Sequence, residues 1–148
     1  MFRKGRRLFS AAAISLIVIA GLHTMGHFTS PEPGSELAAL EATLRATHID
    51  LGAGMKPSMG DVVNSLSLTF TIALVGFALF MLAIASSGSA RMVRIATVVS
   101  TAIVGALVVL FGVYQVLPPF MTLFVSEMIL VSAIAGGTPD DVPEGMAA

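Results

Sequence analysis

Apolar residues along this chain fall into four long runs that are separated by short polar stretches. The runs cover about residues 8–27, 62–86, 95–117 and 120–136. A helix needs about 20 apolar residues to cross a hydrocarbon core of about 30 Å. The first three runs reach that length, whereas the fourth is shorter and contains Glu127. The pattern predicts an all-α fold, an integral membrane four-helix bundle.

A proline pair, Pro118-Pro119, interrupts the apolar sequence between the last two runs. Proline lacks the backbone donor and clashes with the preceding turn, so we expect the third span to end at Leu117 and the fourth to begin at Phe120. Residues 1–136 then form a single transmembrane domain. The polar segment 137–148 contains Pro and Gly, which predicts a disordered cytoplasmic tail.

The longest polar stretch lies between the first two apolar runs. Ser35 follows a Pro- and Gly-containing turn and is suited to cap a helix. After it, Leu37, Leu40 and Leu44 recur at spacings of three and four residues. We therefore expect a short extra helix in the outer loop between the first two spans. Its apolar stripe would lie on the membrane surface or over the mouth of the bundle.

Composition narrows the class of protein further. The chain is 55% hydrophobic and only 11% charged, whereas a soluble domain carries about 25% charged residues. Asp, Glu, Lys and Arg are absent from residues 8–31, 62–90 and 95–126. These facts exclude a soluble globule, a disordered chain and a nucleic-acid binder, and they make the lipid bilayer the expected partner. Without Cys there is no disulfide and no cysteine-based metal site.

The distribution of basic residues predicts the orientation. Two groups, Arg3–Arg7 and Arg91–Arg94, flank the first, second and third spans on one side, and only Arg45 and Lys56 fall on the other. By the positive-inside rule, both termini face the cytoplasm of a bacterium, and the protein is a multi-pass protein of its inner membrane. This orientation requires an even number of spans and so supports the short fourth segment.

The N-terminus also has an alternative interpretation. The basic FRKGRR sequence followed by an apolar run resembles a signal peptide, with Val18-Ile19-Ala20 as an acceptable cleavage pattern. Retention as a helix is favoured, because the run approaches spanning length and cleavage would leave an odd number of apolar segments.

Polar residues within spans are informative, because each must face the bundle interior or a cavity. The six that we expect at similar depth, in the outer half of the spans, form a predicted polar intramembrane cluster: His23, His27, Asn64, Tyr114, Gln115 and Glu127. His23 and His27 are four residues apart and so share one face of the first helix.

Three hypotheses follow from this cluster. The favoured one is structural hydrogen bonding between spans in an accessory membrane protein without a catalytic constellation. The second is a divalent metal site with His23, His27 and Glu127 as ligands, completed by Asp61 or His48. The third is a small proton-coupled carrier that uses the same groups. Haem is disfavoured, because two histidines on one helix face cannot clamp both sides of one haem, and only ligation by a histidine and a methionine stays open.

Small residues form a stripe on the third span. Thr97, Thr101 and Gly105 recur every four residues, and Gly112 follows one heptad later. Such faces let helices approach closely in lipid. The stripe suits either packing within the chain or a homo-oligomer.

The end of the first span carries the sequence GLHTMGHF, residues 21–28. With the D-x-G and S-x-x-D segments that follow, it resembles a family of small four-helix bacterial integral membrane proteins that carry an HTxGHF motif and have no assigned activity. The resemblance extends over residues 7–134 and implies the architecture. The matching residues are His23, Thr24, Gly26, His27, Phe28, Asp50, Gly52, Ser58 and Asp61.

Overall fold

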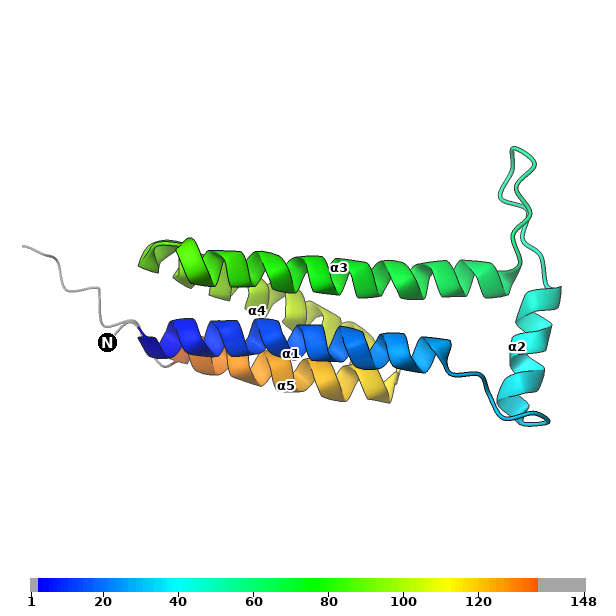
Figure 1. Ribbon diagram of the computed structural model, residues 1–148, viewed down its shortest axis with the longest axis horizontal. Helices are drawn as coiled ribbons and strands as arrows, with labels where there is room; N and C mark the ends of the chain where they lie inside the picture. The colour runs from blue at the N-terminus through cyan, green and yellow to red at the C-terminus, as the bar shows by residue number, and fades with distance from the viewer. Residues whose placement is uncertain (1–2, 136–148) are drawn as a thin grey trace, which may run out of the picture. The chain divides into compact units, whose positions relative to one another are not determined.

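The computed structural model describes residues 3–135 and confirms the all-α prediction. Its helices are α1 (Arg3–Phe28), α2 (Glu36–Ala46), α3 (Met59–Ser87), α4 (Ala90–Val113) and α5 (Leu117–Ala135) (Figure 1). Within the described range there is no β-strand, only one isolated bridge between His48 and Ser58. The tail predicted at 137–148 lies outside the described residues.

Four helices are long and apolar enough to cross a membrane: Lys4–Phe28, Met59–Ser87, Ala90–Val113 and Leu117–Ala135. The first three begin before the apolar runs do, because the basic residues at the start of α1 and α4 and the polar residues at the start of α3 are themselves helical. The apolar pattern therefore predicts that each helix is present but does not locate its ends.

The junction between the last two spans differs from the prediction. α4 ends at Val113, and Leu117 begins α5 instead of ending the third span. Gln115 adopts a positive φ of 56°, and the Val116 N–H donates to the Phe111 carbonyl at 3.0 Å, as in a Schellman helix end. Pro118 and Pro119 occupy the first turn of α5, where backbone N–H groups have no intrahelical acceptor to lose. The proline pair starts a helix here, and α5 thereby reaches 19 residues.

The chain divides into two compact units. The bundle unit comprises Met1–Ile19 and Leu74–Ala148, and the loop unit comprises Ala20–Ala73. α1 and α3 each contribute residues to both units.

In the bundle unit, the described segments of successive helices run in alternating directions. The Arg6 guanidinium donates to the Gly88 carbonyl in the α3–α4 loop at 2.7 Å. At the same end, a Cβ placed on Gly5 would lie 3.6 Å from the Ala133 carbonyl oxygen near the end of α5. The start of α1, the α3–α4 loop and the end of α5 therefore lie together.

The core of the bundle unit is built from one stripe on each helix. Its members recur at spacings of mostly three or four residues, the spacing of a helix seam in a bundle. They are Phe9, Ala12, Ala13, Leu16, Leu74, Ala78, Met81, Ala85, Val93, Thr97, Ser100, Val104, Leu123, Ser126, Leu130 and Ala133. Many are small, as expected where helices must approach closely in lipid. Ser126 is fully buried and shares a 2.8 Å hydrogen bond with Ser15 on α1.

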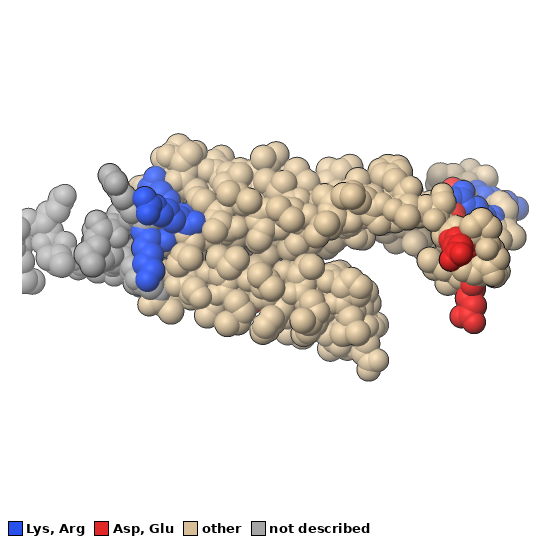
Figure 2. Space-filling model, turned by 60° about the horizontal axis from the view of Figure 1, so that its bottom comes forward, with Lys and Arg blue, Asp and Glu red and all other residues tan. Residues whose placement is uncertain are grey.

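Basic side chains of the bundle unit gather at one end of its helices. Figure 2 shows Lys and Arg side chains as a blue band there, and the tan surface of the helices beside it shows no Lys, Arg, Asp or Glu in that view. The sequence places these side chains at the starts of α1 and α4: Lys4, Arg6, Arg7, Arg91 and Arg94. The exposed apolar surface is that of a protein solvated by acyl chains.

The loop unit has a different construction. The Ser35 side chain accepts a hydrogen bond from the Ala38 N–H at 3.2 Å, which confirms the predicted cap of α2. The segment between α2 and α3 folds back on itself, with the Ile49 N–H donating to the Pro57 carbonyl at 3.0 Å. Residues 52–54 all have positive φ at the tip of this segment. The structure describes every residue of this unit, and only Ala20, Ser58 and Gly60 are buried.

Candidate functional site

Within the loop unit, His23 connects the end of α1 to the start of α3. Its Nε2 lies 2.8 Å from the Ser67 hydroxyl, and its ring meets the edge of Phe70 with centroids 5.7 Å apart. Both contacts join two helices that cross the membrane. A polar side chain between membrane-spanning helices needs a hydrogen-bond partner. The contact with Ser67 supplies one and agrees with the hypothesis that His23 has a structural role.

One turn further along α1, His27 has no such partner. Its ring lies 5.2 Å from that of Phe28, and no hydrogen bond of its ring nitrogens occurs within the described chain. His27 and Asn64 both line one groove of the loop unit, whose cavity volume is about 470 Å³. The groove is the candidate functional site.

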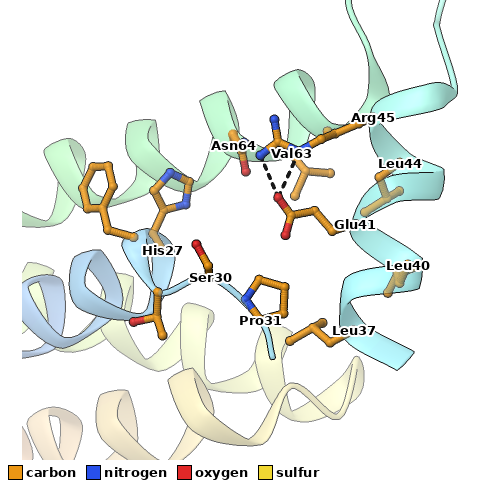
Figure 3. A pocket seen from close by; sticks show the side chains of 13 residues that line it. His27, Ser30, Pro31, Leu37, Leu40, Glu41, Leu44, Arg45, Val63 and Asn64 are labelled. Carbon is orange, nitrogen blue, oxygen red and sulfur yellow. Dashed lines mark hydrogen bonds and ion pairs between the residues drawn. The ribbon is translucent and has the colours of Figure 1, made fainter. Parts of the chain in front are cut away.

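Three segments of the loop unit form the groove: the end of α1 with the residues after it, α2, and the start of α3 (Figure 3). Its apolar lining includes the predicted α2 stripe and residues of the other two segments: Phe28, Pro31, Leu37, Leu40, Leu44 and Val63. Its polar lining comprises His27, Thr29, Ser30, Glu41, Arg45 and Asn64. The site is thus amphipathic, with hydrogen-bonding groups beside a leucine surface.

The α2 wall of the groove is uncovered. No residue of α2 is buried, and Leu37 and Leu40 are 62% and 53% exposed. An isolated apolar stripe of this kind is normally covered by a core, a partner or a membrane. Within the described chain nothing covers it.

An ion pair orders the polar edge of α2. The Arg45 Nε and Nη2 both donate to Glu41 Oε1, at 2.9 and 2.6 Å. The Arg45 stem approaches α3 at Gly60, where an added Cβ would lie 3.2 Å from the Arg45 Cγ. Glu41 and Arg45 were missing from the predicted site, although their spacing of four residues is a sequence signal for a helical ion pair.

Asp61 lies in the first turn of α3 and completes the N-terminal cap of that helix together with Ser58. Its Oδ2 accepts from the Ser58 hydroxyl at 2.7 Å and from the Ser58 N–H at 3.2 Å, and its own N–H donates to the Ser58 hydroxyl. This is a reciprocal capping arrangement, which satisfies free donors in the first turn of α3. The S-x-x-D spacing signals it in the sequence.

Three other predicted site residues belong to the bundle unit. Tyr114 and Gln115 lie in the turn between α4 and α5, where both are exposed. Glu127 lies in the middle of α5, half-buried, with Oε1 near Gly105 of α4. Its buried Oε2 has no hydrogen-bond partner. Interaction of Glu127 with the histidines stays a prediction.

A metal would need several ligands close together. Among residues 3–135, no group of three or more His, Asp or Glu side chains is arranged to hold one. The divalent-metal hypothesis for His23, His27, Glu127 and Asp61 therefore stays a prediction.

No family model matches the chain, and no curated protein or solved structure matches it either. The class of protein follows from the fold itself. Four long apolar helices make this a multi-pass membrane protein, and its loop unit carries an amphipathic groove.

Proposed function

We propose that this is an accessory protein of the bacterial cytoplasmic membrane that holds a phospholipid of the outer leaflet in the groove of its loop unit. One observation carries the proposal: the leucine stripe of α2 is uncovered and faces the hydrogen-bonding ends of two membrane-spanning helices. The role is one of binding and organisation, without a catalytic step.

The groove offers suitable contacts for both parts of a phospholipid, the acyl chain and the headgroup. An acyl chain would remove Leu37, Leu40 and Val63 from water, at a gain of about 25 cal/mol for each Å² of apolar surface covered. His27 and Asn64 offer hydrogen bonds to the phosphate or ester oxygens of a headgroup. Both groups stand near the ends of spanning helices, which is the depth at which headgroups and acyl chains meet.

The proposed orientation places the loop unit outside the cytoplasm. The basic residues at the starts of α1 and α4 mark the cytoplasmic side by the positive-inside rule, and the contact between Arg6 and Gly88 supports a common location for them. Both termini are then cytoplasmic, and the segment between α1 and α3 faces the outer leaflet.

Orientation can be tested by cysteine labelling, because the chain has no native Cys. A membrane-impermeant maleimide applied to intact cells should label Leu51→Cys in the outer loop and leave Ser87→Cys at the end of α3 unlabelled. Both positions are exposed. The reverse labelling would overturn the orientation.

Lipid binding is tested in nanodiscs of phosphatidylethanolamine and phosphatidylglycerol that contain a diazirine-bearing acyl chain. We expect photolabelling of α2 peptides in the wild type and a several-fold loss in Leu40→Glu, because a carboxylate in the stripe repels an acyl chain. Leu51→Glu is the matched control, since Leu51 is 58% exposed and lies outside the groove. Equal labelling of α2 in both variants would contradict the proposal.

The remaining interpretations stay predictions. A metal site at His23 and His27 would compete with the contact between His23 and Ser67. Metal analysis of the purified wild type against the His23→Ala/His27→Ala double variant tests it, and binding at background level would remove it. Membership of the HTxGHF family and homo-oligomers through the Thr97–Gly105 face are likewise untested.

A further inference from the structure

Glu127 is placed near the middle of its membrane span. It follows the first residue of α5, Leu117, by 127 − 117 = 10 positions, and it precedes Ala135 by 135 − 127 = 8. At 1.5 Å per residue, the carboxyl-bearing residue is about 15 Å from one end of the helix and about 12 Å from the other. This depth is within the hydrocarbon core of a bilayer.

The contacts of Glu127 leave its carboxyl group unsatisfied. Oε1 would lie 3.2 Å from a Cβ on Gly105, so the carboxyl packs against a bare stretch of α4 backbone. Oε2 is buried and has no hydrogen-bond partner. The side chain is therefore held against another helix at a point where that helix offers no side-chain donor.

The threonine hydroxyls on the α4 stripe that contains Gly105, and the hydroxyl of Ser126, are already engaged. Thr97 donates to the Val93 carbonyl at 2.7 Å, and Thr101 donates to the Thr97 carbonyl at 2.9 Å. Ser126, the neighbour of Glu127 in sequence, shares its hydrogen bond with Ser15. A carboxylate needs hydrogen-bond donors, and each of these hydroxyls already uses its single O–H in another hydrogen bond.

No positive charge is available at this depth in the described part of the bundle unit. On α4, no titratable residue occurs between Arg94 and Tyr114; Arg94 precedes Gly105 by 105 − 94 = 11 positions, about 16 Å along the helix. α1 carries none from Leu8 to Ile19, and α3 carries none from Leu74 to Ser87. Glu127 is also the only acidic residue among the described residues of this unit.

An unpaired carboxylate in hydrocarbon is costly, whereas the neutral acid is tolerated. We propose that Glu127 is a proton-binding site inside the membrane, at which the carboxyl group holds its proton at neutral pH and exchanges it from within the bundle unit. The site is independent of the lipid groove, and it concerns a different ligand, the proton.

A hydrophobic carbodiimide distinguishes such a site from an ordinary carboxylate. The carboxyl proton passes to one nitrogen of dicyclohexylcarbodiimide while the carboxyl oxygen bonds to the central carbon, which forms an O-acylisourea. The acyl group then migrates from oxygen to nitrogen and gives a stable N-acylurea. The reagent adds as a whole, without a leaving group or a redox change, and the reaction consumes the protonated acid.

The experiment uses the full chain in nanodiscs with dicyclohexylcarbodiimide, read by mass spectrometry of peptides. We expect one reagent molecule per chain on Glu127 at neutral pH and none at this position in Glu127→Gln. Above the pH at which the proton leaves, labelling should fall by about tenfold per pH unit, in step with the protonated fraction. A carboxyl that does not exchange its proton with solvent would give no such pH profile.

Glu41 provides the matched control, because it is ion-paired to Arg45 at a water-exposed site. A water-soluble carbodiimide with an added amine should modify Glu41 and spare Glu127. Absence of label on Glu127 from the hydrophobic reagent, or equal labelling of both residues by the water-soluble one, would overturn the proposal. Neither result bears on photolabelling of α2, so the two proposals fail separately.

Discussion

The bundle unit and the loop unit use the same two helices, α1 and α3, in opposite ways. In the bundle unit, the α1 residues Phe9, Ala12, Ala13 and Leu16 are completely buried. In the loop unit, the continuation of α1 carries Leu22 and Met25 at 58% and 70% exposure. The same apolar helix therefore has a buried stripe in the bundle unit, whereas Ala20 is its only buried residue in the loop unit.

The interactions that stabilise each unit internally also differ. Close packing of small and apolar side chains dominates the bundle unit, as the buried stripes show. The loop unit depends on discrete polar contacts: His23 with Ser67, Ser58 with Asp61, and Glu41 with Arg45. The separate polar contacts of the loop unit leave the leucine stripe of α2 uncovered beside its groove. Three predictions test this comparison.

The largest effect is expected from a cavity in the bundle unit. Leu130→Ala removes a fully buried side chain and should lower the free energy of unfolding by about 2–5 kcal/mol. Leu66→Ala in the loop unit removes a side chain that is 66% exposed, and it should change the value by less than about 0.5 kcal/mol. Reversible unfolding in mixed micelles measures both. Similar losses would show that the two units do not differ in packing.

A smaller effect is expected from the contact between His23 and Ser67. His23→Ala and Ser67→Ala should each destabilise the protein, with a coupling energy of about 0.6–1.5 kcal/mol in a double-mutant cycle. His27→Ala is the control, because His27 makes no hydrogen bond within the described chain, and its loss should be near zero. A coupling energy of zero would mean that the polar contact does not stabilise the loop unit.

The smallest effect is expected at the ion pair on α2. Arg45→Met should cost about 0.3–0.5 kcal/mol, because the pair is exposed and spans one helical turn. High salt should abolish the difference between variant and wild type. Thermal unfolding at low and high ionic strength checks this, and a salt-independent loss would assign the effect to the packing of the Arg45 stem on Gly60.

Local patterns in the sequence determined the number and type of the helices. Apolar length predicted the four spans, Ser35 predicted the cap of α2, and the leucine spacing predicted its stripe. These features depend on residues within a few turns of one another, so one helix at a time is sufficient to predict them. The same logic was wrong at the α4–α5 junction, because a proline pair can end one helix or start the next. The positive φ of Gln115 decided between the two, and no glycine marks that position.

Partnerships between helices were decided only by the tertiary structure. His23 meets Ser67, and Glu127 meets Gly105, through contacts between segments that are 67 − 23 = 44 and 127 − 105 = 22 residues apart. Polar residues in apolar spans identify which side chains need a partner, but the partner depends on the register and direction of neighbouring helices. The same reason explains why the groove residues Glu41, Arg45 and Val63 could not be grouped from the sequence. Hydrophobicity determined that this chain enters a membrane, and helix packing decided which of its polar groups are satisfied there.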